Sequence, residues 1–131
     1  MNILFFLTPK DEVAFIYDDY TVRQAIEKMK HYKYTAIPMI SRDGKYVGTV
    51  TEGDFLRLLT EQTNLCVRDI EHISVSKMKR SVNHQSSNVT SNIEDMFTIA
   101  MNQNFVPITD DQHVFIGIVT RKDIMQYFYK K

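Results

Sequence analysis

Two short segments of the chain carry residue types that could do chemistry, and both carry them in the same order. Residues 48–54 read Gly-Thr-Val-Thr-Glu-Gly-Asp, and residues 117–123 read Gly-Ile-Val-Thr-Arg-Lys-Asp. Each segment follows an apolar stretch typical of a strand and precedes an apolar pattern typical of a helix. The shared pattern, Gly-x-Val-Thr-x-x-Asp, therefore places a hydroxyl and a carboxylate at a helix N-terminus. Unpaired N–H groups and the positive end of the helix dipole favour phosphate at such a place.

The same residues also have a purely structural interpretation. Thr51 with Asp54, and Thr120 with Asp123, have the spacing of a capping box, in which the two side chains satisfy backbone N–H groups. A single copy would favour capping. Two copies in a matched context, each with the preceding glycine and an upstream strand that contains proline, favour ligand binding.

The two segments belong to a longer internal repeat. Pro38 matches Pro107, and Val47 matches Ile116, at the same offset and without a gap. The chain is therefore built from two copies of one unit of roughly 60 residues. We predict an α+β fold in which the two units pack about a pseudo-two-fold axis.

Hydrophobic patterning predicts the same order of elements in both copies, namely strand, helix, strand, strand, helix. In the first copy we expect a strand over 13–17, a helix capped by Thr21 and Gln24, strands over 35–40 and 46–50 joined at Asp43-Gly44, and a helix after Thr51. In the second copy we expect a first strand at 81–83, a helix capped by Ser91 or Asn92, strands over 105–108 and 114–119, and a last helix with Ile124, Met125, Tyr127 and Phe128. Between the copies, Cys66–Ile73 is predicted to form a short helix with Val67 and Ile70 buried.

Composition excludes several classes of function. The 131 residues carry a formal net charge of zero, so bulk attraction predicts neither nucleic-acid nor membrane-surface binding. The apolar run at 3–7 is too short to span a bilayer and lacks the basic residues of a signal peptide. The single Cys66 cannot form an internal disulfide, which fits a reducing cytoplasm. We therefore expect a cytoplasmic location.

Catalytic and metal-binding signatures are absent from the sequence. The four histidines, at positions 31, 72, 84 and 113, lack the spacing of metal ligands. Cys66 has no neighbouring base, and no Walker loop, dinucleotide fingerprint or nucleophile elbow is found. The sequence therefore predicts neither an enzyme nor a metal site.

With these residues in place, the chain resembles the CBS family. Residues 35–38 (Thr-Ala-Ile-Pro) with 48–54 look like one CBS motif, and residues 104–107 (Asn-Phe-Val-Pro) with 117–123 look like a second. Two such motifs, here 1–66 and 67–131, resemble a Bateman module. The resemblance implies a β-α-β-β-α fold in each motif and clefts between the motifs. It also implies that the clefts bind AMP, ADP, ATP, S-adenosylmethionine or a cyclic dinucleotide as a regulatory ligand, with no required cofactor.

The resemblance also implies roles for individual residues of the first cleft. Asp54 would bind the ribose hydroxyls, and Thr51 would bind a phosphate. Thr35 and Ala36 would line the adenine pocket. The remaining predicted ligand-binding residues of this cleft are Ala14, beside the base, Pro38, and Thr8 with Lys10, near the polar side of the nucleotide.

In the second motif the corresponding places belong to Asp123, Thr120, Asn104 and Phe105. Phe105 is bulky where Ala36 is small, and it could occlude the adenine. The first cleft is therefore the better candidate.

Three functions remain open at this point: a module that senses an adenine nucleotide and signals to a separate, unknown protein; a protein-interaction or dimerisation module with degenerate, unoccupied clefts; and, weakest, an enzyme. Family resemblance predicts a homodimer, and surplus apolar residues at Leu56, Met125 and Tyr129 agree with it. The basic residues Lys77, Lys79 and Arg80 fit either a solvated linker or phosphate contacts to a polyphosphate or cyclic dinucleotide near the second cleft.

Overall fold

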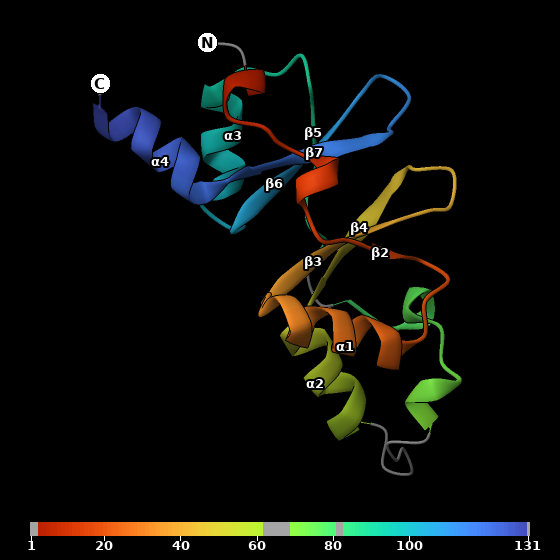
Figure 1. Cartoon of the computed structure of the whole chain (residues 1–131). Coiled ribbons are helices and arrows are strands. Elements are labelled where there is room, and N and C mark those ends of the chain that lie inside the picture. The colour runs from red at the N-terminus through yellow and green to blue at the C-terminus, as the bar shows by residue number, and fades with distance from the viewer. Residues whose placement is uncertain (1–2, 62–68, 81–82, 131) are drawn as a thin grey trace. The chain divides into compact units, whose positions relative to one another are not determined.

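Both sequence repeats fold into the same succession of strands and helices (Figure 1). The computed structural model describes residues 3–61, 69–80 and 83–130. The first repeat forms β2 (Ile16–Tyr17), α1 (Val22–Tyr32), β3 (Ala36–Ile40), β4 (Tyr46–Thr51) and α2 (Glu52–Glu61). The second forms β5 (Ser87–Asn88), α3 (Ile93–Ala100), β6 (Phe105–Thr109), β7 (Phe115–Thr120) and α4 (Arg121–Lys130). The predicted β-α-β-β-α order and the α+β class are confirmed.

The chain divides into two units that do not follow its order strictly. The first-repeat unit consists of Ala14–Asp43 and Val47–Asn83. The second-repeat unit consists of Met1–Val13, Gly44–Tyr46 and His84–Lys131. The short elements are β1 (Thr8–Pro9) and the 3-10 helices η1 (Ile3–Phe5), η2 (Lys10–Glu12), η3 (Asp69–Glu71) and η4 (Val75–Lys77). The N-terminal segment, with β1, is thus part of the unit that contains the second repeat.

The first-repeat unit is a three-stranded sheet, in the order β2-β3-β4, with α1 and α2 packed on it. Strand β2 runs parallel to β3 and pairs Ile16 with Met39. Helix α1 begins with the predicted capping box: the Gln24 N–H donates to Thr21 Oγ1 at 3.1 Å, and the Thr21 N–H donates to Gln24 Oε1 at 2.8 Å. The buried apolar core lies between the helices and the sheet and includes Ile16, Val22, Met29, Ile37, Val50 and Phe55.

The second-repeat unit is a four-stranded sheet in the order β1-β7-β6-β5. Strand β5 runs parallel to β6 and pairs Ser87 with Ile108, which repeats the register of β2 on β3. Helix α3 begins after Asn92, whose side chain accepts a hydrogen bond from the Asp95 N–H at 3.0 Å. Its core includes Ile3, Ile93, Met96, Val106, Val119 and Ile124.

Three short strands differ from the sequence predictions. The strand expected over 13–17 is reduced to Ile16–Tyr17, because only these residues pair with β3. The first strand of the second repeat is Ser87–Asn88. The prediction at 81–83 is wrong for Asn83, which lies outside any strand, whereas residues 81 and 82 lie outside the described residues. Strand β1, which pairs antiparallel with β7, was not predicted.

The two β-hairpins turn differently. Gly44 has a φ of 91°, which a glycine adopts without strain. In the second hairpin the Asp110 carboxylate accepts hydrogen bonds from the N–H groups of Gln112 and Val114, at 2.8 and 3.0 Å. These bonds hold the turn in place of a glycine, and His113 takes the positive φ of 65°.

The predicted helix between the repeats is only partly within the described residues. Cys66 and Val67 lie outside them. The described end of the segment forms η3, in which Ile70 is 7% exposed, so the predicted burial of Ile70 is confirmed. Within the parts of the chain that the structure describes, no helix is long and apolar enough to cross a bilayer.

Candidate functional site

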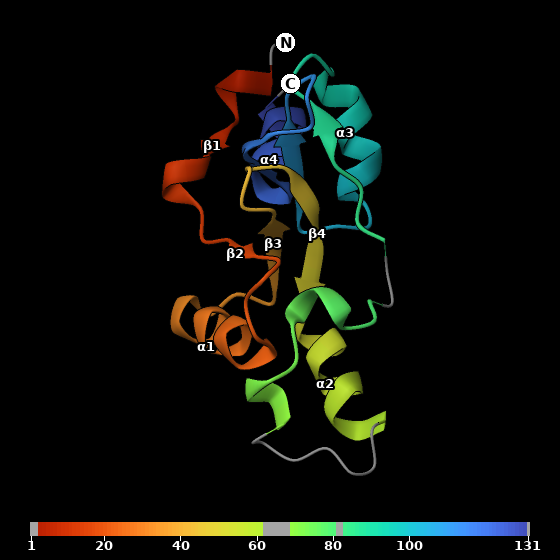
Figure 2. The same ribbon diagram turned by 90° about the vertical axis from the view of Figure 1, so that its right-hand side faces the viewer.

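The predicted motif of the first repeat lies where β4 runs directly into α2 (Figure 2). The Asp54 N–H donates to Thr51 Oγ1 at 3.2 Å, and the Thr51 N–H donates to Asp54 Oδ2 at 2.9 Å. Both halves of a capping box are therefore formed. The carboxylate and the hydroxyl lie on the first turn of α2, where the helix dipole favours negative charge.

Asp54 is the more constrained of the two motif carboxylates. Its side chain is 2% exposed, and its Oδ1 accepts a hydrogen bond from the guanidinium of Arg57, one turn further along α2. A buried carboxylate needs such partners, because an unpaired charge away from water is costly. Arg57 fixes the orientation of the Asp54 carboxylate at the helix N-terminus.

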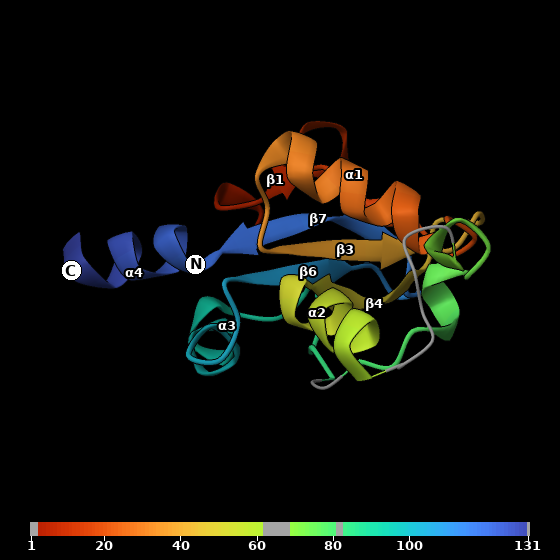
Figure 3. The same ribbon diagram turned by 90° about the horizontal axis from the view of Figure 1, so that it is seen from below.

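The second repeat places the motif in the same way, with α4 following directly after β7 (Figure 3). The Asp123 N–H donates to Thr120 Oγ1 at 3.1 Å, and Asp123 is half-buried. Position 126, which corresponds to Arg57, is a glutamine. Asp123 is therefore more open to solvent than Asp54.

The residue just before β3 contacts the N-terminus of α2, and the residue just before β6 contacts the N-terminus of α4. The Glu52 N–H donates to the carbonyl oxygen of Thr35 at 3.0 Å, and the Arg121 N–H donates to that of Asn104 at 2.8 Å. Thr35 and Asn104 are exposed. The structure thus brings Thr35 beside the motif of the first repeat, and Asn104 beside that of the second.

The other predicted ligand-binding residues lie further from solvent or in short elements. Ala36 and Phe105 are half-buried at the starts of β3 and β6. Pro38 is buried in the middle of β3. Ala14, 9% exposed, packs into the core of the first-repeat unit. In the second-repeat unit Thr8 pairs with Ile118 of β7, and Lys10 begins η2.

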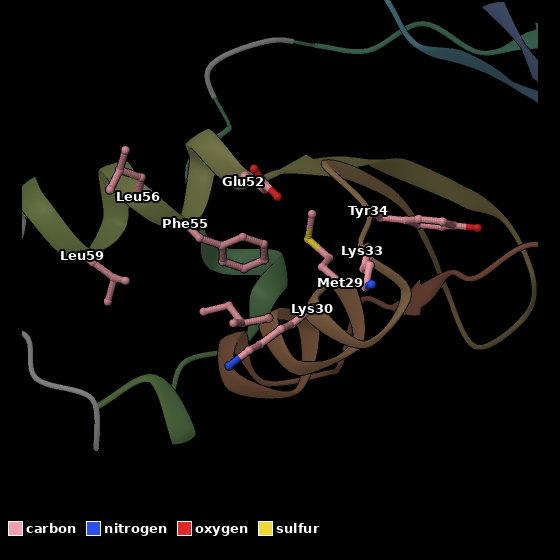
Figure 4. A pocket seen from close by; sticks show the side chains of 9 residues that line it. Met29, Lys30, Lys33, Tyr34, Glu52, Phe55, Leu56 and Leu59 are labelled. Atoms are coloured by element: carbon pink, nitrogen blue, oxygen red, sulfur yellow. The ribbon is translucent and has the colours of Figure 1, made fainter. Parts of the chain in front are cut away.

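An apolar groove of about 540 Å³ lies between α1 and α2 (Figure 4). Phe55 and Met29 are directed into it from the two helices. Leu56 is 64% exposed and Leu59 41% exposed on its wall. Three charged residues, Lys30, Lys33 and Glu52, also line it.

The second-repeat unit has a counterpart of about 380 Å³ between α3 and α4. It is lined by Phe97, Ala100, Met101, Arg121, Ile124 and Met125. Arg121 reaches over the end of α3, where its Nε donates to the carbonyl oxygens of Ala100 and Gln103 at 2.7 and 3.1 Å. Both grooves are separate from the motif carboxylates, which line neither of them.

Two features of the site were missed from the sequence. The pairing of Asp54 with Arg57 has a local signal, since residues three apart on a helix are neighbours. The contact of Arg80 with Gly48 has none, because it depends on the path of the segment 69–80. Among the described residues, no group of three or more His, Cys, Asp or Glu side chains is placed to hold a metal ion.

Comparison with known proteins identifies the family. A family model described as CBS domain matches residues 6–61 and 86–130, which is most of the chain. Inosine-5'-monophosphate dehydrogenase of Methanocaldococcus jannaschii is 29% identical over 117 residues, which are 89% of this chain and 22% of that protein. The chain thus spans about a fifth of the length of that relative.

Solved structures share the fold. A structure of CbpB in complex with c-di-AMP has a TM-score of 0.88 at 21% identity, over 99% of this chain and 85% of that one. A structure of CBSX2 in complex with AMP has a TM-score of 0.78 at 22% identity, over 98% and 96% of the two chains. With two matched segments and a β-α-β-β-α unit in each, the chain belongs to the CBS-domain family.

Proposed function

We propose that this chain is a regulatory module that binds an adenine nucleotide and signals to a separate protein. The observation that carries the proposal is the duplicated junction of strand and helix, where Thr51 with Asp54, and Thr120 with Asp123, meet a helix N-terminus. Such a terminus favours phosphate, and a carboxylate beside it can accept hydrogen bonds from ribose hydroxyls. CbpB with c-di-AMP and CBSX2 with AMP share the fold, which supports this class of ligand.

The residues of the first repeat take the following roles in this proposal. Asp54 accepts hydrogen bonds from the ribose, and Thr51 with the α2 N-terminus contacts a phosphate. Thr35 and Ala36 border the adenine. Ala14 and Pro38 complete the first site, and Asn104, Phe105, Thr120 and Asp123 form the second. The role is regulatory rather than catalytic and requires no cofactor.

A second candidate function is a protein-interaction module whose sites hold no nucleotide. The burial of Asp54 favours this alternative. Its side chain is 2% exposed, pairs with Arg57 and accepts a hydrogen bond from the Thr51 N–H, so its oxygens already have partners within α2 and its cap. Under this alternative the motif is a helix cap in both repeats. The two candidates differ in whether changing Asp54 alters ligand affinity.

We further propose that two copies pair through the groove between α1 and α2. An isologous interface places one surface against itself, so the surface must be self-complementary. The groove joins exposed Leu56 and Leu59 to charges of both signs, from Lys30, Lys33 and Glu52. None of these three charged residues takes part in the ion pairs found among the described residues. Glu52 of one copy can therefore face a lysine of the other.

A thermal-shift screen tests the proposed function directly. A ligand that binds only the folded state raises the midpoint of unfolding, by an amount that grows with its concentration. We expect AMP, ADP, ATP or c-di-AMP to raise it and guanine counterparts to leave it unchanged. An unchanged midpoint with every adenine ligand up to millimolar concentration would favour the interaction module.

A further inference from the structure

The side chain of Gln103 holds the segment just before β5 in the second-repeat unit. Its Oε1 accepts a hydrogen bond from the Gln85 N–H at 2.6 Å, and its Nε2 donates to the Gln85 carbonyl oxygen at 3.0 Å. The same Nε2 donates to the carbonyl oxygen of Phe105 at 3.1 Å. Gln103 is 6% exposed, so its amide is a buried group whose donors and acceptor already have partners.

This amide lies beside the motif of the second repeat. Arg121, the first residue of α4, donates from its Nε to the Gln103 carbonyl oxygen at 3.1 Å. Its N–H donates to the carbonyl oxygen of Asn104, the next residue, at 2.8 Å. The bonds between Gln103 and Gln85 are therefore close in the chain to Asn104 and Thr120, which are proposed to meet the second nucleotide.

The matching residues of the first repeat make no such bonds. Ala14 corresponds to Gln85, because each stands two residues before the first residue of its strand, β2 or β5. Tyr34 corresponds to Gln103 in the repeat, and it packs against the core of the first-repeat unit. Within the described part of the chain Ala14 takes part in no hydrogen bond, so its N–H and carbonyl oxygen are open to a ligand.

The amide of Gln103 presents the same hydrogen-bonding pattern as an edge of adenine. Adenine carries an acceptor ring nitrogen beside its amino group, and a primary amide carries an acceptor oxygen beside its NH2 group. Either planar group can bond at once to the N–H and the carbonyl oxygen of one extended residue, as a neighbouring strand does. An adenine at Gln85 would need the two backbone groups that Gln103 already holds.

We propose that Gln103 closes the second repeat to adenine, so that each chain binds one adenine nucleotide, at the first repeat. The inference rests on the proposed function and adds the number of sites and the residue that sets it. A base that displaced Gln103 would leave a buried amide without partners, which is costly. Ala14 imposes no such cost. The duplicated Thr and Asp motif suggests two equal sites, whereas the residues before β2 and β5 make them unequal.

Calorimetric titration with AMP, ADP and ATP in turn counts the sites of the wild type and of Gln103→Ala. We expect one nucleotide per chain for the wild type and two for the variant, because alanine frees the N–H and carbonyl oxygen of Gln85. The second site of the variant should bind at least about tenfold more tightly than any second site of the wild type, as expected for hydrogen bonds to the base.

Gln103→Met is a second variant that keeps the core filled. Methionine has a similar length and no amide, and its flexible chain can move aside for a base. It should also bind two nucleotides, with an unfolding midpoint nearer that of the wild type. Adding Asp123→Ala to either variant should weaken the new site by about tenfold or more and leave the first site unchanged.

Two control variants separate the amide from general effects. Gln112→Ala removes an exposed glutamine of the same unit and should still bind one nucleotide per chain. Asn92→Ala removes the cap of α3 and lowers stability without touching Gln103. It should also bind one, which would show that loosening the unit does not create a second site.

The possible outcomes separate the inference from the proposed function. Two nucleotides per wild-type chain, or one per chain in the wild type and in both Gln103 variants, would overturn the inference and leave the proposed function standing. A second site that also appears in Asn92→Ala would overturn it as well. Binding by the Gln103 variants alone would support the inference and refute the proposed site of the first repeat. If no variant binds an adenine nucleotide, both are wrong.

Discussion

Asp54 accepts a hydrogen bond from the backbone N–H of Thr51 at 2.9 Å, while its own N–H donates to the Thr51 hydroxyl at 3.2 Å. The same two residues are thus the cap of α2 and the predicted contacts to a nucleotide. The two roles use the same geometry, because a helix N-terminus that orders a hydroxyl and a carboxylate also offers N–H groups to an anion. Stability and affinity must therefore be measured together.

Asp54→Ala is expected to lower the free energy of unfolding by roughly 2 kcal/mol, because it removes a helix cap and the buried partner of Arg57. Chemical unfolding in urea measures this value. Asp54→Asn is the matched control, since it keeps the shape and one acceptor oxygen. The asparagine variant should lose less stability than the alanine variant, and equal losses would mean that the charge and not the cap dominates.

Asp123→Ala should cost less, about 1 kcal/mol, as expected for loss of a cap at a half-buried position. No arginine stands at position 126 to be left without its partner. Urea unfolding of both alanine variants in one buffer gives the comparison. A larger loss for Asp123→Ala than for Asp54→Ala would contradict the effect expected from the deeper burial of Asp54.

Leu56→Asp should break the proposed pairing of two copies, because it puts a carboxylate on the exposed wall of the α1–α2 groove. Light scattering at micromolar concentration should report a dimer for the wild type and a monomer for the variant. Met125→Asp, at the equivalent place of the other groove, is the control.

The charges of the groove give an independent check on the same interface. Glu52→Lys should weaken the dimer by juxtaposing like charges, and adding Lys30→Glu and Lys33→Glu should restore it with the signs exchanged. Failure of the triple variant to recover, or a dimer lost only in Met125→Asp, would place the interface elsewhere.

The partial burial of Lys28 should make the free energy of unfolding depend on pH. Its Nζ lies 5.2 Å from the ring centre of Phe15 and 5.8 Å from that of Tyr20, and burial lowers its pKa below 10.5. Between the folded and unfolded pKa values the unfolded chain binds more protons, so this group makes stability rise with pH. The cost of burying the charge is present at neutral pH and disappears as the pH rises through that window.

Lys28→Met removes this contribution while keeping an apolar contact with both rings. The stability of the variant relative to the wild type should therefore fall as the pH is raised from 8 towards 10.5. Urea unfolding at several pH values measures the difference, with Lys122→Met as the control for removing an exposed lysine. A difference that stays constant or grows with pH would show that burial of Lys28 is not the cause.

The sequence was sufficient for elements with strong periodicity or clear caps. Helix α1 begins at the predicted box of Thr21 and Gln24, and α3 begins after Asn92. In these places local hydrogen bonds determine the structure, so local sequence predicts it.

The two strands that the sequence did not predict are formed only through pairing with a neighbouring strand, β1 with β7 and β5 with β6. Strand β5 is the polar pair Ser87–Asn88, and β1 contains Pro9, so neither has strand propensity of its own. Conversely, the apolar residues 13–15 look like a strand but lack pairing with β3. Pairing across the fold, and not composition, decides these short segments.

In the candidate site, too, the local contacts could be predicted from the sequence, whereas the contacts between distant parts of the chain could not. The capping geometry at Thr51 and Asp54 follows from their spacing, and Arg57 lies one turn along the same helix. The contact of Arg80 with Gly48 joins residues far apart in the chain, and the exposed groove needs two helices to be placed side by side. Leu56, Met125 and Tyr129 were correctly expected to be surplus to the core, and they are 64%, 57% and 91% exposed.

The central claim is that the motif binds an adenine nucleotide, and calorimetric titration of the wild type and Asp54→Ala with AMP, ADP and c-di-AMP tests it most directly. We predict saturable binding of at least one ligand to the wild type and roughly a ten- to hundredfold weaker affinity for Asp54→Ala, as expected for loss of a charged hydrogen bond. If the affinity of Asp54→Ala, and that of Asp123→Ala, equals the wild-type value while both variants unfold more readily, the motif is only a helix cap.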